Sequence, residues 1–149
     1  LDYLDPAWPE AAKAAVAGGA YDVILDGNGG ADIISTGAGD DIVTFRGSEI
    51  SIDGGTGTYD MLILAVQGGI TAVDLSVAAG TDITTGDTTV ITNFDRLTAT
   101  ALTTALTVTG STAANWIYLG SGNDTLDGNG GADIITTIRG LGYQLDDPQ

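Results

Sequence analysis

Aliphatic residues recur along this chain every nine residues, and each follows a turn of small and polar residues. The first well-formed unit, at 27–35, reads Gly-Asn-Gly-Gly-Ala-Asp-Ile-Ile-Ser, and the next, at 36–44, reads Thr-Gly-Ala-Gly-Asp-Asp-Ile-Val-Thr. In both units an aspartate is sixth and an aliphatic residue is eighth. Glycine, asparagine and aspartate tolerate the positive φ of tight turns, whereas the last three residues alternate as in a short strand. Each unit therefore predicts a turn and a strand that buries one side chain.

The same unit returns near the other end of the chain, in tandem at 110–118, 119–127 and 128–136. The segment Leu25–Ile34 is repeated without change as Leu126–Ile135. A fixed short period is typical of repeat proteins whose units stack around a continuous core. Two units make one coil of about eighteen residues, so alternate turns stack on the same edge. The sequence thus predicts an all-β fold, a right-handed parallel β-roll or β-helix solenoid.

The turns carry the residues of a cation site. Stacked turns offer backbone carbonyls and carboxylates, which are the oxygen ligands that Ca²⁺ prefers. Alternatively, each aspartate only caps its own turn through hydrogen bonds to the backbone. In four units, however, the aspartate stands two residues before the inward aliphatic residue, and this constant spacing favours calcium ligation. The predicted carboxylate ligands are Asp32, Asp41, Asp124 and Asp133. The predicted carbonyl ligands are those of Gly27, Gly29, Gly37, Gly39, Gly120, Gly122, Gly128 and Gly130.

Three further candidate ligands lie in less regular units. Asp22 belongs to a unit that is one residue short, and Asp60 to a unit that is one residue long. Asn115 is sixth in its unit but lacks the charge. We include all three in the predicted metal set.

The units resemble the G-G-x-G-x-D-x-U-x nonapeptide of the RTX (repeats-in-toxin) family, the hemolysin-type calcium-binding β-rolls of secreted Gram-negative proteins. The resemblance covers 18–62, with lapses after 44, and 110–136. It implies calcium as the cofactor, export by a one-step route read from a C-terminal signal, and an extracellular or cell-surface location. Extracellular modules commonly bind Ca²⁺ with dissociation constants of about 10⁻⁴–10⁻³ M.

The pattern changes outside the two repeat blocks. Residues 1–17 predict a short N-terminal helix, with Pro9 near its start and glycine after its end, that caps the first coil or, alternatively, binds a partner. Residues 63–109 lack a sixth-position aspartate and alternate in β-branched residues. They predict metal-poor coils of the same solenoid, with a looped-out insertion as the alternative. Residues 137–149 are expected to form a C-terminal cap or tail.

Composition excludes several classes of function. The formal charge is −16, from 20 acidic and 4 basic residues. This balance disfavours nucleic acid and anionic membranes as partners, and no apolar run is long enough to span a membrane. The chain has no Cys and no His, which excludes disulfides, thiolate zinc sites and His-based catalysis. No glycine-rich turn completes a dinucleotide-binding or phosphate-binding motif. We expect no catalytic residues.

These observations predict a non-enzymatic calcium-binding module of a secreted or cell-surface protein, whose folding depends on calcium. Neighbouring domains or further copies of the chain are its expected partners. One alternative is the accessory domain of an extracellular protease, lipase or epimerase. A minor alternative is a response-regulator remnant, because 18–25 and 138–145 resemble regulator strands. The residues between them show none of a regulator's helices.

Overall fold

The computed structural model describes residues 20–137 and 144–145, and all regular secondary structure there is β-strand. The helix predicted within 1–17 lies outside these residues, as does most of the predicted C-terminal cap. No helix that could span a membrane occurs in the described part of the chain. The strands are β1 (Ile24–Asp26), β2 (Ile33–Ser35), β3 (Ile42–Phe45), β4 (Ser51–Asp53), β5 (Met61–Leu64), β6 (Ala72–Asp74), β7 (Thr84–Thr85), β8 (Val90–Thr92), β9 (Arg96–Ala99), β10 (Thr107–Thr109), β11 (Trp116–Leu119), β12 (Thr125–Asp127), β13 (Ile134–Thr137) and β14 (Gln144–Leu145).

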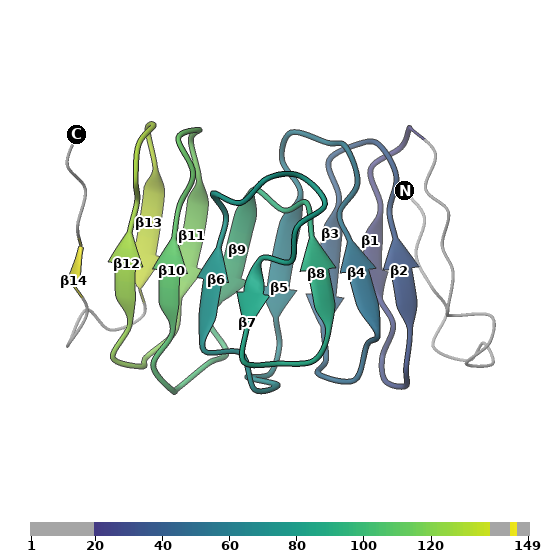
Figure 1. Cartoon of the computed structure of the whole chain (residues 1–149), viewed down its shortest axis with the longest axis horizontal. Helices are drawn as coiled ribbons and strands as arrows, with labels where there is room; N and C mark the ends of the chain where they lie inside the picture. Colours follow the sequence, from purple (N-terminus) through teal and green to yellow (C-terminus); the bar gives the residue numbers. More distant parts are fainter. Residues whose placement is uncertain (1–19, 138–143, 146–149) are drawn as a thin grey trace.

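The strands wind into a parallel β-solenoid, as predicted (Figure 1). One face is a six-stranded sheet in the order β1-β3-β5-β9-β11-β13. The opposite face is divided between a three-stranded sheet, β2-β4-β8, and a five-stranded sheet, β14-β12-β10-β6-β7. Within the repeats the register advances by one eighteen-residue coil, so that Ile24 pairs with Ile42 and Trp116 with Ile134.

The core is a stack of aliphatic side chains between the two faces. The eighth residues Leu25, Val43, Ile117 and Leu126 of their units are fully buried, and Phe45 and Leu119 extend the same rows. The predicted inward position is therefore confirmed. Burial of each such side chain contributes about 1.5–3 kcal/mol relative to its exposure, which makes the aliphatic row the main source of cohesion between coils.

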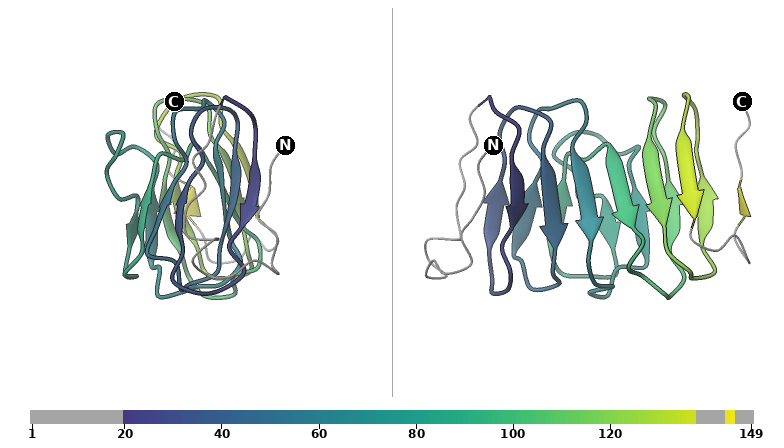
Figure 2. Two further views of the ribbon diagram at one scale, coloured as in Figure 1. Left: turned by 90° about the vertical axis from the view of Figure 1, so that its right-hand side faces the viewer. Right: turned by 180° about the vertical axis from the view of Figure 1, so that it is seen from behind.

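Residues 65–92, which follow β5 and which we call the insertion, depart from the two-strand coil. Strand β6 pairs with β10 and β8 pairs with β4, both in parallel, whereas β7 pairs with β6 in antiparallel fashion. The insertion projects from one side of the flattened cross-section (Figure 2). The expectation of uninterrupted parallel coils is wrong at β7, because alternation of β-branched residues specifies the face of a strand but not its direction.

Two edges run along the solenoid, one at each end of the strands. The aspartate edge, at the top of Figure 1, consists of the turns that lead into the six-stranded sheet, namely 36–41, 54–60, 93–95, 110–115 and 128–133. The mixed edge, at the bottom, includes the turns that leave that sheet, namely 27–32, 46–50, 100–106 and 120–124.

Candidate metal sites

A ladder of equivalent side chains runs along the aspartate edge, each just before a strand of the six-stranded sheet. Oδ1 of Asp41 accepts the N–H of Val23, and Oδ1 of Asp60 accepts the N–H of Asp41, both at 2.9 Å. Oδ1 of Asp133 accepts the N–H of Asn115 at 2.9 Å. Each carboxylate therefore caps the equivalent residue of the preceding coil and not its own turn. The ladder consists of Asp41, Asp60, Asp95, Asn115 and Asp133.

The second oxygen of two ladder carboxylates is buried without a hydrogen bond. Asp41 has no exposed surface, and its Oδ2 has no hydrogen-bond partner. Oδ2 of Asp133 is likewise buried and has no hydrogen-bond partner. A buried carboxylate oxygen that lacks a partner is destabilising, and a bound cation would remove this penalty. The ladder thus fits a cation that approaches between successive coils.

Neighbouring turns on this edge pack so closely that only glycine fits between them. A Cβ atom on Gly57 would overlap the carbonyl oxygen of Gly39, and one on Gly55 would overlap that of Gly37. The carbonyl of Gly37 also accepts the N–H of Thr56 at 2.7 Å. The close approach places backbone oxygens of one turn beside the carboxylate of the next.

The same contact recurs between turns 110–115 and 128–133. The N–H of Gly130 donates to the carbonyl of Ser111 at 3.3 Å, and a Cβ atom on Gly110 would lie 2.6 Å from the carbonyl oxygen of Gly128. Within 20–137, no three acidic side chains form a metal-binding group. A cation at either stack would therefore take most of its ligands from backbone carbonyls, which suits Ca²⁺ better than a transition metal.

Carboxyl groups in the middle of the ladder are buried close to one another, which affects their pKa. Burial raises the pKa of Asp60 to about 7, and the neighbouring carboxylates of Asp41, Asp95 and Asp40 add to the shift. Burial also raises the pKa of Asp95, although the guanidinium of Arg96 opposes the change. A cation bound beside these groups would stabilise their ionised forms.

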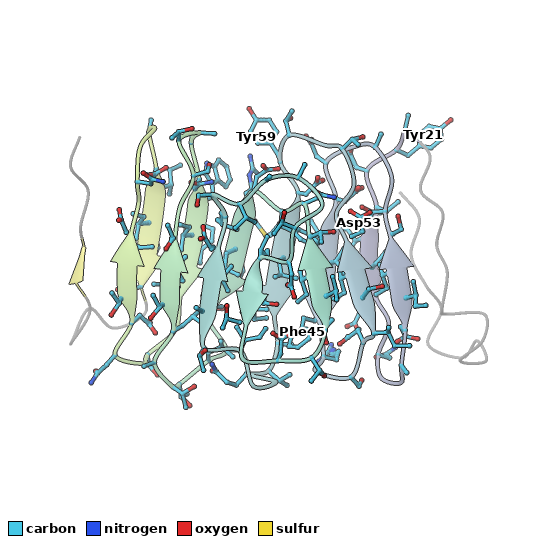
Figure 3. All side chains as sticks on the ribbon, in the orientation of Figure 1. Tyr21, Phe45, Asp53 and Tyr59 are labelled. Carbon is cyan, nitrogen blue, oxygen red and sulfur yellow. The ribbon has the colours of Figure 1, made fainter. Side chains whose placement is uncertain are left out.

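The structure brings eight of the fifteen predicted ligands together in two stacks. Turn 36–41, with Gly37, Gly39 and Asp41, packs on turn 54–60 with Asp60. Turn 110–115, with Asn115, packs on turn 128–133, which holds Gly128, Gly130 and Asp133. Tyr21 and Tyr59 mark the same edge in Figure 3.

Asp22 lies one position away from the ladder. Its Oδ1 accepts the N–H of Asp40 at 2.8 Å, and the ladder position of its coil is occupied by Val23. The side chain of Asp22 is exposed. It therefore lies beside turn 36–41 and outside the ladder.

The other predicted ligands lie on the mixed edge, namely Gly27, Gly29, Asp32, Gly120, Gly122 and Asp124. Turn 27–32 packs on 46–50, where the N–H of Gly30 donates to Ser48 Oγ at 3.2 Å. Turn 120–124 packs on 100–106, where the N–H of Ser121 donates to the carbonyl of Leu102 at 3.1 Å. Neither 46–50 nor 100–106 has the glycine and aspartate pattern. Among the described turns, this edge does not bring two repeat turns together.

Both mixed-edge aspartates are nevertheless buried, Asp32 to 1% exposure and Asp124 to 3%. Oδ1 of Asp124 accepts the N–H of Leu106 at 3.0 Å, the contact that ladder carboxylates make. Burial raises the pKa of Asp124, and this hydrogen bond opposes the shift.

Turn 46–50 is held by the protein's own side chains. The buried carboxylate of Glu49 accepts the N–H groups of Arg46, Gly47 and Ser48 at 2.8, 2.9 and 3.0 Å. The guanidinium of Arg46 pairs with Asp26 at 2.5 Å, and this hydrogen bond lowers the pKa of the Asp26 carboxyl. The turn thus satisfies its polar groups without a metal.

Sequence reasoning missed Asp95, because 63–109 was expected to contain no sixth-position aspartate. That expectation is wrong, since Asp95 precedes β9 in register with Asp60. Its turn has lost the glycines that mark the other units. The remaining signal is the triplet Asp95-Arg96-Leu97, an aspartate two residues before an inward aliphatic residue.

Comparison with known families agrees with this geometry. The family model for the RTX calcium-binding nonapeptide repeat matches residues 15–43 and 107–137 in four copies, together about two fifths of the chain. No curated protein and no solved structure is significantly similar to the chain. The matched segments include turns 36–41, 110–115 and 128–133 of the aspartate edge, together with 27–32 and 120–124 of the mixed edge.

Proposed function

We propose that this chain, which carries RTX calcium-binding nonapeptide repeats at both ends of a β-solenoid, is a calcium-binding β-roll module of a secreted or cell-surface protein. The observation that carries the proposal is the stacking of glycine-rich turns around carboxylates whose second oxygen is buried without a hydrogen bond. We take the coils to be right-handed, as nearly all parallel β connections are.

The proposed sites lie between successive turns of the same edge. On the aspartate edge, Asp41, Asp60 and Asp133 supply carboxylates, and the carbonyls of Gly37, Gly39, Gly128 and Gly130 supply the remaining protein ligands. On the mixed edge, Asp32 with Gly27 and Gly29, and Asp124 with Gly120 and Gly122, pack on turns without the repeat pattern, so we propose weaker calcium binding there. Calcium would satisfy these oxygens and join one coil to the next.

We further propose that calcium completes the fold. A chain with a formal charge of −16 repels itself when compact, and ordering of glycine-rich turns carries a large entropy cost. Each Ca²⁺ ion cancels two charges and fixes two turns, so metal binding and folding are coupled. Millimolar extracellular calcium would then favour the folded state after export. The module itself is non-catalytic in this proposal, and any enzymatic activity belongs to other domains.

Calorimetric titration of the chelator-treated chain tests the proposal. Calcium should bind with dissociation constants in the micromolar to millimolar range, whereas Mg²⁺ should bind far more weakly because it demands a tighter octahedral site. A double variant, Asp41→Asn with Asp133→Asn, should lose part of the heat of calcium binding, because two negative ligands are removed. Both asparagines keep the oxygen that accepts the backbone N–H, so the loss reports on the metal and not on this hydrogen bond. Equal binding of the two metals, or none of either, would refute the calcium assignment.

The proposed location needs a separate experiment. Fractionation of the native cells, followed by immunoblotting, should find the protein in the medium or on the surface. Its presence only in the cytoplasm would contradict that part of the proposal and leave the calcium sites unaffected.

A further inference from the structure

A cavity opens on the aspartate edge where the row of turns is interrupted. Turn 93–95 is four residues shorter than its neighbour 54–60, and a space of about 370 Å³ lies beside it. The backbone of 55–57 forms one wall. Apolar side chains from the insertion, including Leu75, Val77 and Ile83, line it together with Phe94. We call this space the edge pocket.

Hydrogen bonds hold the walls of the edge pocket in place. The side chain of Asn93 donates to Asp53 Oδ1 at 2.7 Å, and its Oδ1 accepts the N–H of Gly80 at 2.8 Å. Asp53, labelled in Figure 3, also accepts the N–H of Gly55 at 2.9 Å. One asparagine thus joins turn 54–60 to the insertion, and the pocket is formed before any ligand binds.

Two carboxyl groups, those of Asp60 and Asp95, line the pocket. Oδ2 of Asp95 accepts the N–H of Asp60 at 3.4 Å, which is a long hydrogen bond. The side chain of Asp60 is 1% exposed, and that of Asp95 is half-buried. The neighbouring cation, Arg96, lies between the rings of Tyr59 and Trp116, at 4.3 and 3.9 Å from their centres.

The edge pocket differs chemically from the other gaps between turns. Between 36–41 and 54–60, and between 110–115 and 128–133, the turns are in contact and leave room only for an ion among oxygens. Beside 93–95 the edge pocket has the size of a small-molecule site, for which volumes of about 300–1,000 Å³ are usual. Half of its lining residues are apolar. A bare ion would not use the apolar wall, whereas a cation with an organic body would use both.

We propose that the edge pocket binds a primary ammonium group on a short aliphatic chain, with the charge at Asp95 and the chain against Leu75, Val77 and Phe94. Such a group occurs in free alkylamines and in lysine side chains of other proteins. Charge attraction toward this acidic chain and burial of the methylene groups act together. The proposal does not depend on calcium binding elsewhere on the solenoid.

Titration of the ¹⁵N-labelled full chain with n-pentylammonium chloride, followed by amide chemical shifts in calcium, tests this inference. Shifts are expected at 55–60, 77–83 and 93–95. Asp95→Asn should weaken binding at least tenfold, since asparagine keeps the acceptor for the Asp60 N–H but removes the charge. Asp74→Asn is the matched control, because it removes one charge from the outer side of the insertion and should change affinity less than twofold.

Further arms separate the alternatives. Ala79→Leu fills the pocket without a change of charge and should also abolish binding. 1-Pentanol and ammonium chloride, which carry only the chain or only the charge, should each bind at least tenfold more weakly than n-pentylammonium. If a lysine-containing peptide shifts the same amides, the natural ligand is a lysine side chain of another protein. If only the free amine shifts them, the natural ligand is a small molecule. Shifts spread evenly over the acidic edges, unchanged binding by Asp95→Asn, or stronger binding of Mg²⁺ than of the amine at these residues would overturn the proposal.

Discussion

The two edges of this solenoid perform the same structural task by different means. On the aspartate edge, turns such as 36–41 and 54–60 rest on one another through glycine, with buried carboxylate oxygens that have no protein partner. On the mixed edge, turn 46–50 satisfies its N–H groups with Glu49 and places Arg46 against Asp26. In the proposed account, one edge takes up an external cation, whereas part of the other supplies its own.

This difference suggests a rule for where repeat turns bind calcium, which we propose from two equivalent aspartates. Asp124 and Asp133 both accept an N–H from the preceding coil, at 3.0 and 2.9 Å. The turn that packs under Asp133 is another repeat turn, whereas the turn under Asp124 is 100–106, which lacks the pattern. We therefore propose that a calcium site needs both a repeat aspartate and a second repeat turn on the same edge.

The largest expected difference between the edges is in calcium-dependent stability. Asp133→Asn should lose about 2–3 kcal/mol of the stabilisation that calcium provides at roughly a hundred times its dissociation constant. Asp124→Asn should lose less than about 1 kcal/mol, because its coil neighbour contributes few ligands. Urea unfolding of both variants, in calcium and in EGTA, measures the effect. Equal losses in calcium would show that the edges do not differ in metal binding.

Part of this comparison follows from the sequence and part does not. The nine-residue frame predicts the buried row, such as Leu25 and Val43, because burial depends on local alternation. Which turn packs against a given turn depends on the length and path of the chain in the adjacent coil. The insertion with the antiparallel strand β7 changes that path, so residues far apart in sequence become neighbours. The nine-residue frame does not identify Asp95 for a related reason. Its turn, 93–95, follows the insertion and has no glycine.

The pH dependence of the metal-free chain should reveal the charge shortage on the aspartate edge. The pKa of Asp60 is about 7 in the folded chain and near 4 when unfolded, so folding takes up a proton between these values. This contribution to stability is fully present below pH 4 and is lost as pH rises to 7, by at most about 1.4 kcal/mol per pH unit. Thermal melts in EGTA from pH 5 to 8 measure it.

Asp60→Asn is the control for this titration, because asparagine keeps the acceptor for the Asp41 N–H. The stability of the parent relative to the variant should fall as pH rises from 5 to 8. The contributions of the other acidic groups largely cancel, because both proteins contain them. Calcium affinity of the parent should fall as pH drops below 7, since the proton and the ion compete. Parallel pH profiles for the two proteins would show that Asp60 does not titrate near neutrality.

The smallest expected effect concerns the ion pair on the mixed edge. Arg46→Met should reduce stability by less than about 1 kcal/mol, because the pair with Asp26 is partly exposed and solvent screens it. The loss should be the same in calcium and in EGTA and should shrink at high salt. Urea unfolding in low and high salt checks this expectation. A loss seen only in EGTA would mean that calcium replaces the guanidinium at turn 46–50.

Residue-resolved hydrogen exchange with and without calcium tests the central claim most directly. The N–H groups of Val23, Asp41 and Asn115 donate to ladder carboxylates, whereas those of Gly47 and Ser48 donate to Glu49. Calcium should slow exchange at the first three at least tenfold relative to the last two. Equal protection of both sets, or no response to calcium at either, would contradict a metal-dependent aspartate edge.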